Sequence, residues 1–272
     1  LLATKTALAY GDIVLTEAGF GADLGGEKFM DVKARFGDLD VAGAVLVTTI
    51  RSMKYNGGVA KDNLTDENLD ALRDGIVNLE RHVENMRKFG IAPVVAVNLF
   101  PSDTDAEREF MRSWASEFGV ALEESDVFAK GGDGAMDLAR TLLDNLDAEA
   151  TQLYDPAEGI EASISTIAQE IYRAKDVVYG AKAVKDLKYI KDNGWDNFPV
   201  VISKTQYSFS DDPTQLGAPE GHTLHVRELL PRTGSGFIVV LTGDVMTMPG
   251  LPKKPSAERI DVDTDGVISG LF

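Results

Sequence analysis

The chain contains no cysteine, and this absence excludes several kinds of site. Disulfides, thiolate nucleophiles and zinc–thiolate sites all require cysteine side chains. Long apolar runs are also missing, because stretches such as residues 91–100 (IAPVVAVNLF) are far shorter than the ~20 residues that a bilayer-spanning helix needs. No signal peptide is visible. We therefore expect a cytoplasmic protein that has no membrane partner.

Positive charge is scarce relative to negative charge. The sequence has 27 Lys and Arg residues against 44 Asp and Glu residues, which gives a formal net charge of −17. A field of this sign repels nucleic acid, so we discount nucleic acid as a partner. An anionic substrate stays possible, because local basic groups can outweigh the global field. The 272 residues suffice for a large core, and they favour two packed units over one.

A phosphate-binding loop of the Walker A type is absent, because the chain has no Gly-Lys-Ser/Thr triplet. The chain also begins without methionine, in a stretch that looks helical and leads directly into an expected strand. We therefore expect that the natural N-terminus lies before Leu1.

What is present is an alternation of strand and helix patterns. Strands are expected at 12–19, 43–50 and 92–98, and helices at 22–36, 65–90 and 103–119. The β-branched run at 43–50 is typical of a strand buried on both faces. In the expected helix 65–90, which Thr65 would begin and Gly90 end, apolar residues recur at three- and four-residue steps: Leu69, Leu72, Ile76, Leu79, Val83 and Met86. This order predicts an α/β fold with a mostly parallel sheet and crossover helices.

The last hundred residues predict a smaller α+β part. Helices are expected at 159–174 and 181–193, and residues 198–212 read as a strand that runs into a polar loop. Two strands at 222–229 and 236–245, joined by a turn-rich segment, predict an antiparallel pair, and the acidic stretch 261–268 reads as a β-turn. We divide the chain into domains at 1–90, 91–195 and 196–272.

Several loops after expected strands have residues suited to ligands, since functional loops lie at the carboxyl ends of parallel strands. In the glycine-rich loop 17–29, Gly19, Gly21, Gly25 and Gly26 could present backbone N–H groups to an anion. The alternative is a tight turn with glycines for packing. Arg51 and Lys54 follow the next strand and could contact a phosphate or carboxylate, or could form an ordinary surface pair.

Two phenylalanines follow later strands of the same expected sheet. Phe100 is fixed by Pro101, and Phe128 precedes Lys130 and a glycine cluster at 131–134. If the two loops converge, the rings could enclose a flat heteroaromatic ligand, with Lys130 at the edge of the slot. The alternative for Phe100 is core packing.

Other polar residues carry less information. Lys204, Gln206, Tyr207 and Ser208 form a dense polar cluster, while the histidines at 82, 222 and 225 are scattered. We expect no metal site from them.

Long strings in this sequence resemble formate–tetrahydrofolate ligases. They include TEAGFGADLGGEKFMDVKARF, VTTIRSMKYNGGV, KFGIAPVVAVNLFPSDTDAE, VFAKGGDGAMDLA and VVISKTQYSFSDDPTQLGAP, and the resemblance runs from residue 1 to 272. The family makes 10-formyltetrahydrofolate from formate, tetrahydrofolate and MgATP, through formyl phosphate. The resemblance implies a P-loop-NTPase-like fold with an incomplete first domain, a homo-oligomer (a tetramer in the family), and a possible monovalent cation as a further cofactor.

The resemblance also implies roles for single residues. The family holds the pterin ring between two aromatics, one in an Asn-x-Phe-Pro segment and one before Ala-Lys-Gly-Gly, which correspond to Phe100 and Phe128. Pro101 and Lys130 belong to the same segments. The second aromatic is often tryptophan in relatives, so Phe128 implies weaker folate binding. The loop with Gly19, Phe20 and Gly21 is similar to the one beside the nucleotide, with Phe20 near the adenine.

The family's phosphate-binding loop and the basic residues that grip formyl phosphate lie in a segment earlier than Leu1. Phosphoryl transfer needs positioned cations and a phosphate cradle. We therefore expect that this chain alone does not catalyse the complete reaction. We expect it to be a C-terminal fragment or one piece of a split enzyme; the alternative is a catalytically silent module that binds folate or supports assembly.

Overall fold

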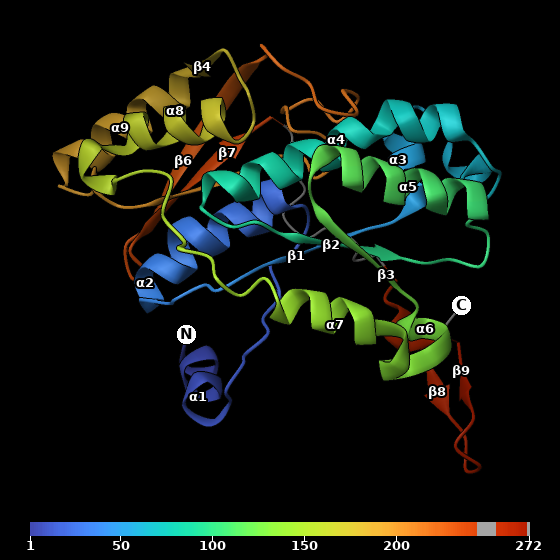
Figure 1. The fold of residues 1–272 in the computed structure, drawn as a ribbon. Coiled ribbons are helices and arrows are strands. Elements are labelled where there is room, and N and C mark those ends of the chain that lie inside the picture. The colour runs from blue at the N-terminus through green and yellow to red at the C-terminus, as the bar shows by residue number, and fades with distance from the viewer. Residues whose placement is uncertain (244–253, 271–272) are drawn as a thin grey trace.

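A computed structural model describes residues 1–243 and 254–270 of the chain. The first sheet has three parallel strands, β1 (Val45–Thr48), β2 (Val94–Asn98) and β3 (Ala121–Ser125), in the order β1-β2-β3. Helices α3 (Ile50–Asn56), α4 (Leu69–Lys88) and α5 (Asp105–Phe118) cover one face of this sheet, and α7 (Met136–Leu143) lies on the other (Figure 1). These crossover connections confirm the predicted α/β class.

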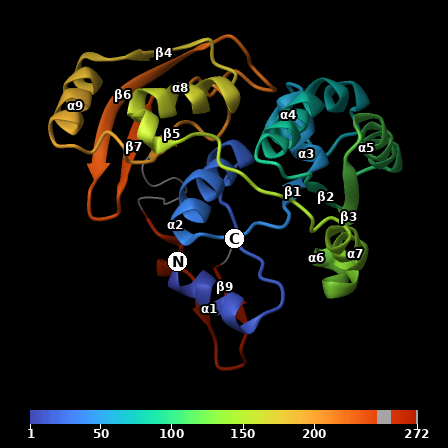
Figure 2. The same ribbon diagram turned by 60° about the vertical axis from the view of Figure 1, so that its left-hand side comes forward.

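The second sheet is mixed. Its strands β4 (Asp176–Tyr179), β5 (Val200–Ser203), β6 (Thr223–Arg232) and β7 (Phe237–Thr242) are ordered β4-β6-β7-β5. β6 and β7 pair antiparallel, as predicted, whereas β4–β6 and β5–β7 are parallel. Residues 244 and 245 of the expected strand 236–245 lie outside the described residues. Helices α8 (Ile160–Glu170) and α9 (Ala181–Asp192) pack on this sheet (Figure 2).

The helix predicted at 22–36 lies between the two sheets (Figure 2). It is wound mainly as two π-helical segments, η1 (Ala22–Gly26) and η2 (Phe29–Ala34), followed by the short α2 (Arg35–Gly37). π-helical turns are rare and often occur at functional sites. Met30 of η2 joins the core of the second sheet, so this segment connects the glycine-rich loop to that core.

Helix caps explain where the long helices begin. α4 begins after Asn68, whose side chain accepts a hydrogen bond from the Ala71 N–H at 2.9 Å, so Asn68 and not Thr65 is the cap. α5 begins after Thr104, which forms a capping box with Glu107. Capping satisfies N–H groups that have no partner within the first helical turn. The predicted apolar stripe of α4 is buried from Leu72 to Met86. Its residues pack in the core of the first sheet, except Met86, which packs in the core of the second sheet.

Of the strand predictions near the N-terminus, the one at 12–19 is wrong, and the one at 43–50 is confirmed as a strand but not in its burial. Residues 12–19 form no strand, and Ile13 and Leu15 are exposed. β1, expected to be buried on both faces, pairs only with β2 among the described strands, and the Val47 side chain is 71% exposed. β-branched composition predicts extended backbone, but burial on both faces requires other elements to pack over both faces.

A strand was expected before Phe128, but its bounds were not predicted, and β4 was not predicted at all. β3 has the sequence ALEES, and its two glutamates are held by side chains of neighbouring helices: Thr141 donates to Glu123, and Arg108 pairs with Glu124. Such tertiary partners make a polar strand stable, and local propensity does not reveal them.

The remaining elements are short apart from α1 (Leu2–Tyr10) at the N-terminus. They are α6 (Val127–Lys130), η3 (Lys61–Asn63), η4 (Gly131–Ala135), η5 (Pro156–Glu158), η6 (Ser256–Glu258), β8 (Asp261–Val262) and β9 (Ile268–Ser269). β8 and β9 form a two-stranded hairpin around the predicted turn. Among the described helices, none combines the length and apolar character needed to cross a membrane. The division into 1–90, 91–195 and 196–272 stays a prediction.

Candidate functional site

The carboxyl ends of β1, β2 and β3 bring three of the predicted site residues to one edge of the first sheet. Arg51 follows β1, Phe100 follows β2 and Phe128 follows β3. The Leu99 N–H donates to the Ser125 carbonyl at 3.0 Å, which holds the second and third loops side by side. Since the strand order is β1-β2-β3, the loop of Phe100 lies between the other two.

Phe100 is partly buried and one of its faces is occupied. The guanidinium carbon of Arg51 lies 4.1 Å from the ring centroid, and Arg51 Nη2 donates to Ser102 Oγ at 3.0 Å. The backbone N–H of Phe100 donates to Asp103 Oδ2 at 2.8 Å, and the Asp103 N–H returns a bond to the Phe100 carbonyl at 2.9 Å. The Phe100 loop is therefore fixed from both its side chain and its backbone.

Phe128 is the opposite case, because its side chain is 93% exposed. It lies on α6, where Lys130 Nζ pairs with Asp126 at 3.0 Å. The segment after it is compact, since a Cβ added at Gly134 would lie 2.3 Å from the Asp126 carbonyl oxygen, and Gly131 has a φ of +57°. The cluster of glycines thus permits close backbone approach and a left-handed turn, which other residues disfavour.

The two rings do not stack on each other in the described structure, where Phe100 and Phe128 are not a ring pair. Pro101 and Lys130 are exposed at the same edge. The arrangement is an open edge flanked by two aromatic side chains, one fixed and one free. The sandwich of a flat ligand between them stays a prediction.

Lys54 was predicted to lie beside Arg51 at the strand ends, but its side chain points into the protein interior. Its ammonium is fully buried, pairs with Glu107 Oε1 at 2.8 Å and donates to the Asp66 carbonyl at 2.8 Å. Burial raises the pKa of Glu107, but the hydrogen bonds from Lys54 and from the Thr104 N–H outweigh burial and hold that pKa below its ordinary value. The Lys54 charge is thus neutralised inside the protein and does not face the strand ends.

Gly19, Phe20 and Gly21 form an exposed turn before η1. Phe20 has a φ of 62° although it is not glycine, and its side chain is 68% exposed. A Cβ at Gly25 would lie 2.0 Å from the Gly19 carbonyl oxygen, so the loop folds tightly onto its own backbone. Left-handed backbone at a bulky residue is strained, and such strain is concentrated at functional sites.

Comparison with known proteins assigns the family. The family model for formate–tetrahydrofolate ligase matches residues 1–272. The chain belongs to the formate–tetrahydrofolate ligase family. Curated formate–tetrahydrofolate ligases of Corynebacterium diphtheriae and Corynebacterium jeikeium are 63% and 59% identical to it, and one of Staphylococcus aureus is 55% identical. Each match covers 100% of this chain but only 50%, 48% and 49% of the relative, so the chain spans about half the length of the curated relatives it matches.

One feature of this ligase segment was not predicted from the sequence. Lys204, at the end of β5, pairs with Asp23 of η1 at 2.7 Å, and it also donates to the Thr205 carbonyl at 3.1 Å and to the Ser208 carbonyl. Burial raises the pKa of Asp23, but the charge and hydrogen bond of Lys204, together with His82 and Lys28, outweigh burial and lower that pKa below its ordinary value. The polar cluster after β5 thus lies directly behind the glycine-rich loop.

A cavity of about 110 Å³ lies at this junction. Gly21 and Asp23 line it from the loop, Asn78 and His82 from α4, and Tyr207 from the segment after β5. Burial lowers the pKa of His82, which favours a neutral imidazole. The walls of this cavity therefore offer mainly uncharged hydrogen-bonding groups beside the predicted nucleotide loop.

Two buried carboxylates belong to the same π-helical region. Burial, together with the charge of Glu27, raises the pKa of Asp31 to about 8, and burial also raises the pKa of Glu27. Asp31 Oδ1 accepts a hydrogen bond from the Leu153 N–H at 2.7 Å, and Glu27 pairs with Lys28 at 2.7 Å. One carboxylate oxygen on each residue lacks a partner. This pair therefore binds a proton in the pH range where most carboxyl groups are ionised.

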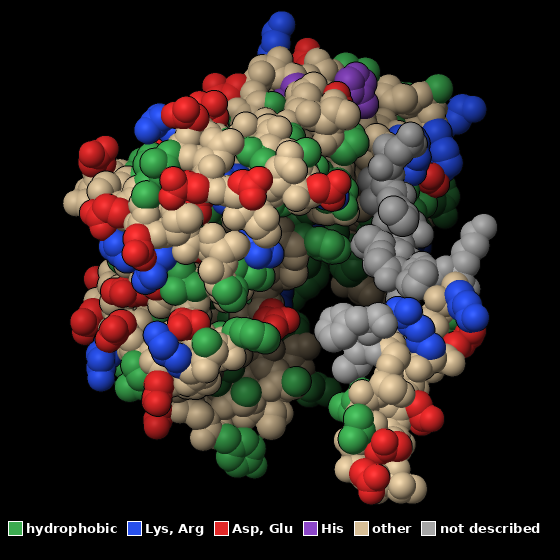
Figure 3. All heavy atoms as spheres, turned by 90° about the vertical axis from the view of Figure 1, so that its right-hand side faces the viewer, with side chains coloured by type: hydrophobic (Ala, Val, Ile, Leu, Met, Phe, Trp, Pro, Cys, Tyr) green, Lys and Arg blue, Asp and Glu red, His purple; other side chains and the backbone are tan. Residues whose placement is uncertain are grey.

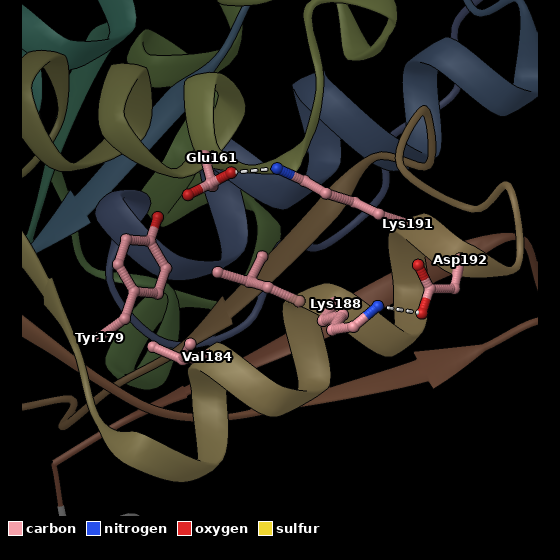
Figure 4. Close-up of a pocket in the computed structure, with 7 residues that line it drawn as sticks. Glu161, Tyr179, Val184, Lys188, Lys191 and Asp192 are labelled. Carbon is pink, nitrogen blue, oxygen red and sulfur yellow. Dashed lines mark hydrogen bonds and ion pairs between the residues drawn. The ribbon is translucent and has the colours of Figure 1, made fainter.

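A larger hollow of about 330 Å³ lies between α8, β4 and α9 (Figure 4). Tyr179 and Val184 line it, and two ion pairs stand at its rim, Lys188 with Asp192 at 2.7 Å and Lys191 with Glu161. None of the predicted site residues lines this hollow. In a space-filling view of another face, acidic and basic side chains are interspersed (Figure 3).

Proposed function

We propose that this chain is part of an enzyme that ligates formate to tetrahydrofolate with ATP, giving 10-formyltetrahydrofolate through formyl phosphate. The family match over all 272 residues carries the proposal. The chain contributes the folate slot, formed by Phe100, Pro101, Phe128 and Lys130, and part of the nucleotide site, formed by Gly19, Phe20 and Gly21. The reaction takes place in the cytoplasm, in a homo-oligomer.

The edge of the first sheet supports the proposed folate slot. A flat pterin ring gains dispersion and hydrophobic contact from each phenyl face that it covers. Phe100 is held in place by Arg51 and Asp103, whereas the exposed ring of Phe128 is free to close over a ligand. Binding would thus bury an aromatic side chain that is exposed without ligand, and this burial supplies part of the affinity.

The nucleotide enters this reaction as MgATP, and a monovalent cation is a further proposed cofactor. The turn at Gly19, Phe20 and Gly21 presents an exposed aromatic ring and backbone N–H groups to the nucleotide. Residues 1–243 and 254–270 contain no group of three or more His, Cys, Asp or Glu side chains that could hold a metal ion, so we assign Mg²⁺ no ligand there. Arg51 and Lys54 both have partners within the protein, so we assign neither of them to a phosphate cradle.

Substitution of the two phenylalanines tests the folate slot. Phe100→Ala and Phe128→Ala should each weaken tetrahydrofolate binding, by roughly 0.5–1.5 kcal/mol for lost stacking and more for lost burial. Calorimetric titration of the ligase that contains this segment measures the change. Tyr189→Ala is the matched control, because it removes an exposed aromatic side chain from α9, a helix that packs on the second sheet and not on the first. Unchanged affinity in both phenylalanine variants would reject the slot.

A second candidate is a catalytically silent module that binds folate or supports assembly, or a piece of a split enzyme. Its support is that the chain spans about half the length of its relatives and contains no Walker A triplet. The two candidates differ in activity. ATP-dependent formation of 10-formyltetrahydrofolate by the longer ligase, but not by residues 1–272 alone, identifies the chain as part of the enzyme. Folate binding without turnover in the longer protein would favour the silent module.

A further inference from the structure

The Arg51 guanidinium, which the sequence suggested as a contact for an anion, lies against an aromatic ring instead. Its carbon atom is 4.1 Å from the Phe100 centroid, within the range of a cation–π contact. Nη2 donates to Ser102 Oγ at 3.0 Å, and the partnerless Nε is buried. Nη2 is therefore bonded to the Phe100 loop, and Nε is closed off from solvent.

Strand order decides which face of the ring this contact covers. Arg51 is the second residue of α3, whose N-cap Thr49 directly follows β1, and Phe128 follows β3, while Phe100 follows the central strand β2. Arg51 and Phe128 therefore approach the Phe100 loop from opposite sides. A guanidinium that covers the ring from the β1 side would leave the β3 side for a ligand, and Phe128 lies on that side.

We propose that Arg51 is a positioning residue that makes Phe100 a one-sided platform for the pterin ring. The guanidinium backs the ring, holds its plane and prevents a flat ligand from entering on the β1 side. Arg51 does not itself contact the ligand. This inference rests on the proposed folate slot, and it adds the element that orients the slot.

The affinity of the intact ligase for tetrahydrofolate tests this role. Arg51→Met keeps the length of the side chain and removes both the charge and the planar group, and it should weaken binding about 2- to 10-fold, the range expected for loss of one cation–π contact. The affinity for ATP should change less than about twofold, because the nucleotide loop is a separate segment. Arg73→Met is the matched control, since the Arg73 guanidinium lies 5.9 Å over Phe110 on the surface of α4 and α5.

A double variant separates positioning from other roles. In a Phe100→Leu background the platform is absent, so Arg51→Met should cause no further loss of affinity. Arg51→Lys should restore little in the presence of Phe100, because an ammonium lacks the flat face of guanidinium. A loss that persists in the Phe100→Leu background, or full rescue by lysine, would overturn the proposal and indicate that Arg51 contacts the ligand as a charge.

Folding and the dependence on the slot are controlled separately. If Arg51→Met does not fold, Ser102→Ala removes only the hydrogen bond that holds the guanidinium; weaker tetrahydrofolate binding then supports the proposal and unchanged binding overturns it. If Phe100→Ala and Phe128→Ala leave affinity unchanged, the folate slot itself is wrong. If both weaken binding and Arg51→Met does not, the slot stands and the positioning role is wrong.

Discussion

The ammonium of Lys204 lies 2.7 Å from Oδ2 of Asp23, and both side chains are buried. Lys204 directly follows β5 of the second sheet, and Asp23 lies in η1, within the glycine-rich loop 17–29. A buried charge without its partner is costly because it has lost its hydration. This ion pair therefore ties the predicted nucleotide loop to the end of β5, across a junction of segments far apart in the sequence.

Removal of the cation should destabilise the fold strongly. Lys204→Met leaves the Asp23 carboxylate buried and unpaired, and the free energy of unfolding should fall by about 3–5 kcal/mol. Chemical denaturation measures the change. Lys188→Met is the control, because the pair of Lys188 with Asp192 is exposed and should contribute about 0–1 kcal/mol. Equal effects of the two substitutions would contradict a special role for the buried pair.

The buried acid pair predicts a pH dependence of stability. Folded Asp31, with a pKa raised to about 8, keeps a proton that the unfolded chain loses near the ordinary value of 3.8. Between these two values the folded state binds more protons, so its contribution to stability decreases as pH rises. Asp31→Asn keeps an acceptor for the Leu153 N–H and removes the ionisation. The free energy of unfolding of the variant should therefore fall less steeply with pH, and near pH 8 it should exceed that of the parent protein.

Unfolding followed across this pH window provides the measurement. The pKa of Glu27 is also raised, so the free energy of unfolding of the variant should still fall with pH, but with a smaller slope than in the parent protein. Asp137→Asn is the control at an exposed carboxylate. An unchanged slope in Asp31→Asn would show that Asp31 ionises in the folded protein as it does in the unfolded chain.

The glycine-rich loop should not tolerate a side chain at Gly25. The added Cβ of Gly25→Ala would lie 2.0 Å from the Gly19 carbonyl oxygen and 2.6 Å from the Gly19 nitrogen, so the backbone must move. We expect a loss of about 1–3 kcal/mol, the usual effect of overpacking. At Gly132 no atom lies within 4 Å of an added Cβ, so Gly132→Ala should change stability by less than about 0.5 kcal/mol. Thermal melting of the two variants compares them, and similar melting temperatures would contradict the close approach.

A larger ring at position 128 should strengthen the proposed folate slot. Phe128 is 93% exposed, so Phe128→Trp meets no steric barrier in the protein. The larger face should improve tetrahydrofolate binding by about 0.5–1 kcal/mol through stacking. Titration of the ligase by calorimetry measures this, with Tyr189→Trp as the control. Weaker binding of Phe128→Trp than of the parent protein would show that the slot has no room for the indole.

Residues with strong local patterns were predicted correctly. The apolar period of α4 and the turn-rich link between β6 and β7 both led to the observed elements, because local backbone preference and burial agree there. The bounds of β3 were not predicted, because its polar residues are satisfied by α5 and α7, which only the folded chain brings close. The run at 12–19 has the composition of a strand, but it pairs with no described strand.

The order of residues along the chain determined the α/β class, the parallel edge that carries Phe100 and Phe128, and the family, because these depend on local periodicity and on contiguous motifs. Only the tertiary structure determined which partner each charged side chain has. It buried Lys54 against Glu107, laid Arg51 on Phe100 and joined Lys204 to Asp23. The partner of a charged group depends on which distant segments exclude water around it, and no local pattern contains that information.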